Sequence, residues 1–545
     1  MTSSGFKYSL FLSLITLLIL GGCAKGFKYA DSPYGSNTSP AIKFIKSAAS
    51  PSTASAGDTV SFYVTGIPTD LSGIKIYMNQ VEANVASVKD SLLQIVIPEN
   101  STSGPLEISL NDGQYFIGPV VSIVGAISIS KAFAVGTGTN GPINQIYVSA
   151  DRSYILVGSF DSYNGHPANS EEFADNITDI NATNGSFITT FNTKMKGSVG
   201  AINSICYTTD GYYMIGGAMT GFSDMTSSII SNITRLNYNG SLDTSTVNKI
   251  STDPAQDYFV DTVPTFASSL LGGSVTKIFR DPKADSMLIV LGSFTSYNQY
   301  DYQSSTESAD AYYSVPVTQM CRLYPDGSLD STFNYTSGNG KSNVGLNANI
   351  NDAIQLSDKS IIIVGNFTTF NGQTVNRIAK LSDAGTADLN FNMGGTGANR
   401  TISKITYNST TNKIMIIGDF TTYNGVACNG VAMLNMDGSL DESFNLQSIG
   451  SDYVNFAGQL NNGLVIVSGT FSKYQGFIRQ GFMILNADGT LATKSLNTTG
   501  SFVGRINGFI ETTTELGLPA VTIYGDFSIF DNKNYGNIVR FQFDE

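Results

Sequence analysis

Tryptophan is absent from this 545-residue chain, and histidine occurs once, as His166. A histidine-based catalytic triad and a histidine-rich metal site are therefore both disfavoured. Cysteine is scarce too. Cys206, Cys321 and Cys428 lie far apart, and no two cysteines form a C-x-x-C pair. We therefore expect free thiols in the body of the chain and no bound metal.

Charged residues are also few, at 13% of the chain, and they contain no basic cluster. The 30 Lys and Arg residues against 43 Asp and Glu residues give a net charge of −13. Since contacts to phosphates dominate nucleic-acid affinity, this balance excludes nucleic acid as the expected partner.

Glycine and aromatic residues are what the chain has in excess, with 55 Gly, 27 Tyr and 32 Phe. Glycine supplies positive-φ turns and aromatic side chains fit pleated surfaces, so many short strands joined by tight turns are expected. The length exceeds one ordinary compact core. An all-β chain of more than one domain is predicted.

The first 22 residues read as an export signal, with Lys7 followed by the apolar run LFLSLITLLIL. The run ends in Leu20-Gly21-Gly22-Cys23, which resembles the lipobox of bacterial lipoproteins. The resemblance implies cleavage before Cys23, lipidation of Cys23 and attachment to the cell envelope, with the outer membrane as the expected site. Residues 23–40 are small and polar and predict a flexible tether. Whether the anchor faces the cell surface or the periplasm stays open.

Residues 41–125 predict a separate β-sandwich of immunoglobulin-like type. Alternating segments such as VSFYVTG, IKIYM and LLQIVIP are bounded by Gly, Pro, Asp or Asn. Ser50-Pro51, then AGDTV (56–60), VTG (64–66) and later IVIP (95–98) follow in the order found in the IPT/TIG family, which this segment resembles. The resemblance implies a spacer or binding module of a cell-surface protein, and we expect a spacer.

Seven copies of one phrase follow: an aliphatic run, Gly, any residue, an aromatic, and often Tyr-Asn-Gly. The copies are YILVGSFDSYNG (154–165), YMIGGAMTGF (213–222), MLIVLGSFTSYN (287–298), IIIVGNFTTFNG (361–372), IMIIGDFTTYNG (414–425), LVIVSGTFSKYQG (464–476) and VTIYGDFSIFDN (521–532). Most copies continue into a shorter apolar run and a turn such as NMDGSLDESFN (435–445).

Each part of the phrase has a physical interpretation. The aliphatic run predicts a strand covered on both faces, the Gly a close approach of two sheets, and the next aromatic a contact between repeats. Asn-Gly and Asp-Gly predict type I′ hairpins. A unit of this size with four short strands is typical of one β-propeller blade.

The two ends of the repeat region complement each other. The seventh copy ends near Phe541 without the DGSLD strand, while ISISKAF (127–133) resembles the segment that comes after DGSLD in other copies. We therefore expect a strand near 128–134 to close a seven-bladed propeller spanning 127–545, leaving no open sheet edge. The motifs GxFxxYNG and RLxxDGSLDxxFN resemble the delta-60-type repeats of bacterial surface proteins, which implies a propeller scaffold and no particular reaction.

The third copy carries a longer loop than the later ones, at 299–320, and insertions in repeats often carry the binding face. Its aromatic rings and carboxylates suit a glycan or protein partner, and we predict a binding site at Tyr300, Asp301, Tyr302, Asp310, Tyr312 and Tyr313.

No catalytic residue is predicted. The Gly-rich segments contain no Gly-Lys-Ser/Thr that opens a helix, and D-x-D-x-D-G spacing is missing, so neither a nucleotide cofactor nor calcium is expected. A non-catalytic envelope lipoprotein that binds a glycan or an envelope protein fits best. The alternatives are a structural component of an envelope assembly and a hydrolase or lyase that cleaves glycans with paired carboxylates.

Overall fold

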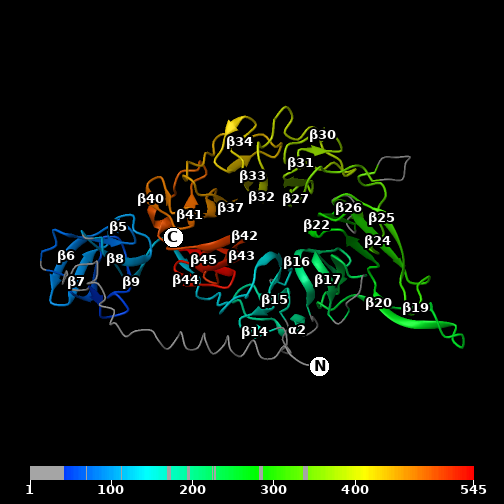
Figure 1. Ribbon diagram of the computed structural model, residues 1–545, viewed down its shortest axis with the longest axis horizontal. Helices are drawn as coiled ribbons and strands as arrows, with labels where there is room; N and C mark the ends of the chain where they lie inside the picture. The colour runs from blue at the N-terminus through cyan, green and yellow to red at the C-terminus, as the bar shows by residue number, and fades with distance from the viewer. Residues whose placement is uncertain are drawn as a thin grey trace, which may run out of the picture.

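The computed structural model describes residues 42–544, apart from 69, 112, 152, 168–173, 193–196, 224, 226–228, 282–286 and 336–341. The predicted export signal (1–22), Cys23 and the tether (23–40) lie outside the described residues. Strands dominate, and the helical elements among the described residues are α2 (Thr189–Asn192) and the 3-10 turn η1 (Lys494–Asn497). The all-β prediction is confirmed, and the strands form a smaller N-terminal unit beside a ring of sheets (Figure 1).

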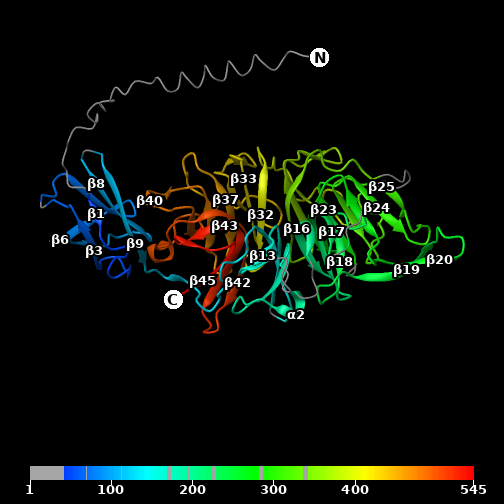
Figure 2. The same cartoon turned by 60° about the horizontal axis from the view of Figure 1, so that its bottom comes forward.

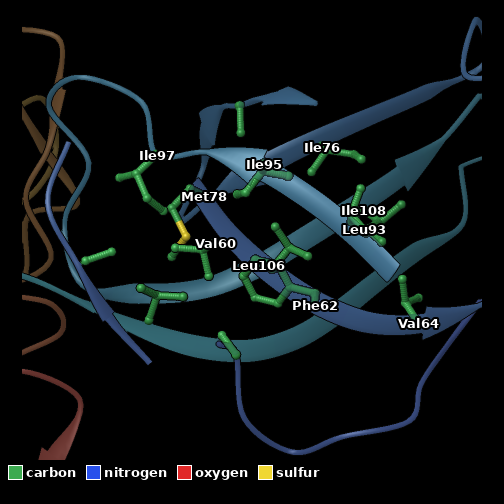
Figure 3. Packing of buried hydrophobic residues seen from close by; sticks show 14 of the residues in the cluster. Val60, Phe62, Val64, Ile76, Met78, Leu93, Ile95, Ile97, Leu106 and Ile108 are labelled. Carbon is green, nitrogen blue, oxygen red and sulfur yellow. The ribbon is translucent and has the colours of Figure 1, made fainter. Parts of the chain in front are cut away.

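The N-terminal unit consists of two sheets that enclose one core (Figure 3). In β3, buried Val60, Phe62 and Val64 alternate with more exposed residues, which is the pattern of a strand with one covered face. The first sheet has the order β1 (Lys43–Phe44), β3 (Thr59–Thr65), β7 (Leu92–Val96), β6 (Asn84–Lys89); the second has the order β2 (Thr53–Ala54), β9 (Tyr115–Ile123), β8 (Gly104–Leu110), β4 (Ile74–Met78), β5 (Val81–Glu82).

The aliphatic runs of the seven copies form the middle strands of seven antiparallel sheets, here called repeat sheets 1 to 7. In chain order their strands are β11 (Ile143–Val148), β12 (Ser153–Gly158), β15 (Ile177–Asn181); β16 (Ser198–Tyr207), β17 (Tyr213–Phe222), β18 (Ile233–Leu236); β22 (Val275–Arg280), β23 (Leu288–Gly292), β26 (Met320–Leu323); β27 (Ile350–Gln355), β28 (Ile361–Gly365), β31 (Ile378–Lys380); β32 (Ile402–Asn408), β33 (Lys413–Gly418), β36 (Val431–Leu434); β37 (Val454–Gln459), β38 (Val465–Gly469), β41 (Phe482–Leu485); β42 (Val503–Thr513), β43 (Pro519–Phe530), β45 (Ile538–Phe543).

Additional strands lie outside the three-stranded core of each repeat sheet. They are β10 (Ile127–Ile129), the hairpins β13–β14 (Ser162–Tyr163, His166–Pro167), β29–β30 (Thr369–Phe370, Gln373–Thr374), β34–β35 (Thr422–Tyr423, Val426–Ala427) and β39–β40 (Lys473–Tyr474, Phe477–Ile478), β44 (Lys533–Asn534), the long hairpin β19–β20 (Thr244–Ile250, Tyr258–Pro264), and the sheet β21 (Ser268–Leu271), β24 (Ser296–Asp301), β25 (Ala311–Pro316).

The repeat sheets pack face to face in chain order. Between β28 and β33, for example, Ile362 and Val364 of one sheet meet Ile414 and Ile416 of the next, and Phe420 from the GDF motif joins them. The predicted contact of this aromatic between neighbouring repeats is confirmed. The last sheet returns to the first, since β11 contacts β42 and β43. The sheets therefore form a closed ring (Figures 1 and 2).

The strand before the ring joins its last sheet. Ile127–Ile129 pairs antiparallel with Phe541–Phe543 of β45, so repeat sheet 7 takes strands from both ends of the region. The remainder of the expected segment 128–134 is not part of β10.

The prediction that the glycine of the GxF motif lies where two sheets approach each other is wrong. The close approach is between two strands of one sheet. A Cβ added to Gly418 would lie 2.1 Å from the carbonyl oxygen of Thr401, which leads into β32 of the same sheet. The cause is a β-bulge after Ile402, which pushes the backbone of β32 toward the end of β33. Since the first strand of every repeat sheet has such a bulge, every copy needs the glycine.

The two kinds of predicted turn differ. Asn424 and Gly425 both have positive φ, at 49° and 82°, which confirms a type I′ hairpin. In the Asp-Gly turn only Gly438 has positive φ, at 84°, so the type I′ prediction is wrong there. Asp437 Oδ1 instead accepts hydrogen bonds from the N–H and the hydroxyl of Ser439, which holds the turn as an Asx turn.

The recurring tyrosine ties these two turns together. The hydroxyl of Tyr423 donates to the Gly438 carbonyl at 2.7 Å, and Tyr163, Tyr297 and Tyr474 make the same bond in their own repeats. The repeated tyrosine therefore has a structural role in each of these repeats.

The N-terminal unit is hydrogen-bonded to repeat sheets 6 and 7, where Figures 1 and 2 both place it. Asn79 and Gln480 exchange side-chain hydrogen bonds of 3.1 and 3.3 Å. The Ser103 N–H donates to the Thr498 carbonyl at 2.8 Å, and the Asn532 amide donates to the Ser103 carbonyl at 2.9 Å. These bonds fix the unit against the ring.

Candidate functional site

A polar cavity lies where the first strands of all seven repeat sheets converge. Its volume is about 460 Å³, within the range of about 300–1,000 Å³ typical of small-ligand sites. Because each first strand contributes to this one cavity, the strands surround the axis of the ring. The lining residues are Asn144, Asn203, Thr276, Lys277, Asn351, Asp352, Ser403, Lys404, Gly418, Asp419, Tyr453, Val454, Asn455, Arg505 and Asn507.

The bulge residue of each first strand carries a polar side chain into this lining. The seven residues are Asn144, Asn203, Thr276, Asn351, Ser403, Asn455 and Asn507. A bulge re-aims a side chain out of the regular alternation of the strand, and it is common beside binding sites.

The asparagine amides also join neighbouring sheets. Asn203 Nδ2 donates to the Val275 carbonyl of the next sheet at 2.8 Å, and Asn351 Nδ2 donates to the Ile402 carbonyl at 2.9 Å. Asn507 Nδ2 donates to the Ile143 carbonyl at 2.9 Å, which links the last sheet to the first. Each Nδ2 is fixed in this way, so the orientation of the amide is set before a ligand arrives.

One buried carboxylate lies between two lysines in the cavity wall. Asp352 is 4% exposed, and its two carboxylate oxygens are 3.3 Å from Lys277 Nζ and 3.3 Å from Lys404 Nζ. It also accepts a hydrogen bond from the N–H of Ile405 at 3.3 Å. Burial acts to raise the pKa of Asp352, but the charges of Lys404 and Lys277 outweigh it and hold this pKa below its usual value.

The mouth of the cavity carries three exposed side chains from consecutive sheets. Asp419 follows β33, Tyr453 precedes β37 with 60% of its surface exposed, and Arg505 lies in β42. The site thus offers amide oxygens, ammonium and guanidinium groups and one aromatic ring. This set suits a hydroxylated ligand better than an apolar one.

The six residues predicted from the long loop form part of another structure. Tyr300 and Asp301 end β24, Tyr312 and Tyr313 lie in β25, and both strands belong to a sheet with β21 at the outside of repeat sheet 3 (Figure 1). None of the six lines the axial cavity.

Two of the predicted tyrosines are largely covered by the protein. Tyr300 is 5% exposed and its ring packs against Tyr312 with centroids 5.5 Å apart. The Tyr302 hydroxyl donates to the Pro264 carbonyl at 2.8 Å. Tyr312 and Tyr313 are 56% and 54% exposed. The aromatic surface available to a partner is therefore that of the last two residues.

The predicted carboxylates have partners within the protein. Asp310 pairs with Lys249 Nζ at 2.7 Å, and Lys249 also pairs with Asp261 at 2.8 Å, which joins β25 to the hairpin β19–β20. Asp301 accepts a hydrogen bond from the Ser304 hydroxyl at 2.6 Å. These two residues hold the insertion together.

Within the described residues, no group of three or more His, Cys, Asp or Glu side chains is placed to hold a metal ion. The same part of the chain contains no helix long and apolar enough to cross a membrane.

The comparisons with known proteins support the propeller. A family model described as a beta-propeller domain of unknown function (DUF5122) matches residues 356–391 and 410–444, which span the middle strands of repeat sheets 4 and 5. The search of curated proteins returned no match.

Several solved structures resemble the chain at low TM-scores. The WD40 beta propeller domain of Doa1 is 13% identical with a TM-score of 0.35, covering 77% of this chain and 98% of its own. A protein of unknown function from Bacteroides thetaiotaomicron VPI-5482 is 10% identical with a TM-score of 0.26, covering 92% and 97%. An auxiliary nutrient binding protein from Bacteroides ovatus ATCC 8483 is 13% identical with a TM-score of 0.18, covering 68% and 94%. These TM-scores support no statement on fold, ligand or partner, and it is the family match that supports propeller-type repeats.

Proposed function

We propose that this chain is a non-catalytic lipoprotein of the cell envelope, whose seven-bladed propeller binds a glycan in its axial cavity. The observation that carries the proposal is the ring of polar bulge residues around a 460 Å³ cavity. The Nδ2 atoms of Asn351 and Asn507 hold neighbouring sheets together, and their Oδ1 atoms remain as acceptors in the lining. Hydroxyl groups of a ligand can donate to such acceptors.

The blades of the proposed propeller are the repeat sheets. Each repeat sheet is one blade, and Ile127–Ile129 closes the seventh. The two sheets of the N-terminal unit correspond to an immunoglobulin-like domain of IPT/TIG type, resting on blades 6 and 7 as a fixed spacer.

The anchor of the proposal is Cys23. Lipidation there, after removal of residues 1–22, attaches the tether and the propeller to the outer membrane. Replacing Cys23 by serine removes the thiol that carries the acyl chain. We expect the variant to take up no labelled palmitate and to leave the membrane fraction, whereas Cys206→Ser labels normally. Equal labelling of Cys23→Ser and the wild type would refute the lipid anchor.

The buried carboxylate of the cavity does not suit the acid role in glycoside hydrolysis. A glycosidase acid must hold a proton near neutral pH, which requires a raised pKa. The two lysines lower the pKa of Asp352 instead. The carboxylate in the cavity wall therefore serves the charge balance of the site.

Filling the cavity tests the proposed site. Ser403 lies in the lining, and its replacement by tyrosine places a bulky ring where the ligand would lie. We expect Ser403→Tyr to lower the affinity for a glycan identified on an array by about tenfold or more, measured by calorimetry on the full chain in detergent. The comparison variant is Tyr312→Ala/Tyr313→Ala. A loss confined to the double variant would move the site to the β24–β25 hairpin and refute the axial cavity.

A further inference from the structure

The axial cavity holds more positive than negative charge. Lys277, Lys404 and Arg505 stand against Asp352 and Asp419, a balance of three cations to two carboxylates. The chain as a whole has a net charge of −13. A positive site in an acidic protein concentrates field lines at the cavity and attracts anions to it.

The lysines share one partner. Asp352 is the carboxylate within ion-pair distance of both Lys277 and Lys404, so one negative charge faces two ammonium groups. Burial lowers the pKa of Lys404, and repulsion by Lys277 and Arg505 adds to this effect while Asp352 opposes it. A bound anion would relieve this repulsion.

The guanidinium of Arg505 stands at the mouth of the cavity. Among the described residues, Arg505 takes part in no ion pair or side-chain hydrogen bond, and it is exposed at the entrance. Guanidinium matches the two oxygens of a carboxylate in a bidentate geometry. Lys404 of repeat sheet 5 and Arg505 of repeat sheet 7 both line the cavity, and their charges are close enough to interact.

Hydrogen-bond acceptors complete the site. Asn351 and Asn507 use Nδ2 to bind the next sheet, which leaves Oδ1 of each residue as an acceptor in the cavity lining. A bare sulfate has no O–H to offer these oxygens, whereas a sugar has several. The ring of Tyr453 at the mouth presents an apolar face, which suits the C–H face of a pyranose.

We propose that the axial cavity binds the uronic-acid end of an acidic glycan. The sugar carboxylate lies between Lys404 and Arg505, its hydroxyl groups donate to Asn351 and Asn507, and its ring rests near Tyr453. This inference depends on the proposed function and narrows it to one class of glycan. Both a charged group and several hydroxyl groups are needed to meet the cations and the free acceptors together.

Calorimetry with matched ligands tests the inference. The full chain in detergent is titrated with trimers of galacturonate, mannuronate and glucuronate, and with the methyl esters of the same trimers. The esters keep every hydroxyl and lose the charge. We expect at least one acid trimer to bind about tenfold or more tightly than its ester, with an affinity that falls as salt rises.

Two variants assign this preference to the cavity. Lys404→Met leaves the Lys277–Asp352 pair in place, and Arg505→Gln changes an exposed residue, so both are expected to keep the fold. Each should reduce the acid-to-ester ratio toward one. The control Lys359→Met removes an exposed lysine from the β27–β28 turn, at the opposite end of β27 from Asn351, and should leave the ratio unchanged.

The outcomes separate the inference from the function that it rests on. Equal binding of acid and ester, or binding of neutral glycans alone, overturns the acidic class and leaves glycan binding in place. Inorganic sulfate that binds as tightly as the acid trimer overturns the requirement for a sugar. Acid preference that survives both variants places the carboxylate elsewhere. If neither the array nor any trimer gives binding, both proposals are wrong.

Discussion

Replacing Arg322 by methionine should lower the free energy of unfolding by about 3–5 kcal/mol. Its guanidinium donates to Asp330 at 2.6 Å through Nε and lies 3.0 Å from Asp281 through a terminal nitrogen. Asp281 and Asp330 are 2% and 4% exposed. Methionine keeps the packing of the side-chain stem and removes the charge. Two buried carboxylates then each lose a cationic partner.

The same guanidinium joins two repeat sheets. It also donates to the Asp383 carbonyl, in the turn of repeat sheet 4, at 3.2 Å. Arg235 and Arg540 make the equivalent contact to the turns of the sheets that follow theirs, through the carbonyls of Pro325 and Thr183. The loss in Arg322→Met should therefore appear as weaker cohesion of the whole ring, seen as a lower urea midpoint by circular dichroism.

Arg377→Met is the matched control. Arg377 donates to the Ala398 carbonyl at 2.7 Å and has no carboxylate partner among the described residues. Its loss should cost roughly 1 kcal/mol, the value of one hydrogen bond. If Arg322→Met costs no more than Arg377→Met, the carboxylate pairing does not stabilise the ring.

The sequence predicts the sheets well because the patterns that specify them are local to each repeat. Alternation, Asn-Gly turns and buried aliphatic runs act over a few residues, so the type I′ turn at Asn424 and the contact of Phe420 between sheets both follow from them. The role of Gly418 could not be predicted from local patterns. Its close approach comes from a bulge in the paired strand, and pairing register is not local information.

The cavity is harder to find from sequence for a related reason. Lys277, Asp352 and Lys404 come from three different repeats, and they meet because the ring brings the same position of each repeat to its axis. A polar residue directly after Ile or Val in each first strand was the available signal. Within a single repeat, this polar residue cannot be told from an ordinary strand residue.

The binding site predicted in the long loop shows why side-chain exposure is hard to predict from sequence. Exposed tyrosines were expected from an insertion rich in Tyr, but β24 also pairs with β21, and this extra strand covers Tyr300. An insertion long enough to form its own sheet buries part of its own aromatic surface.

Replacing Asp352 by asparagine should lower the free energy of unfolding by about 3 kcal/mol. Asparagine has nearly the same shape, so the change removes the charge that lies 3.3 Å from both Lys277 and Lys404. The two ammonium groups, on side chains that are each 20% exposed, then repel each other without compensation. The value lies at the lower end of the range for broken buried pairs because the lysines can turn toward water in the cavity. Urea unfolding of the full chain measures it, and Asp419→Asn at the exposed mouth should change stability by less than about 0.5 kcal/mol.

The pH dependence of this difference identifies its cause. The folded pKa of Asp352 lies below its usual value, so its contribution is fully present above the unfolded pKa of about 3.9 and is lost as pH falls through the folded pKa. The gap between wild type and Asp352→Asn should therefore be constant near neutral pH and shrink in acid. A gap of the same size in acid would mean that the variant loses packing or a hydrogen bond, and that the lysines do not depend on this carboxylate. A bound acidic ligand supplies a second negative charge, so it should narrow the gap at neutral pH as well.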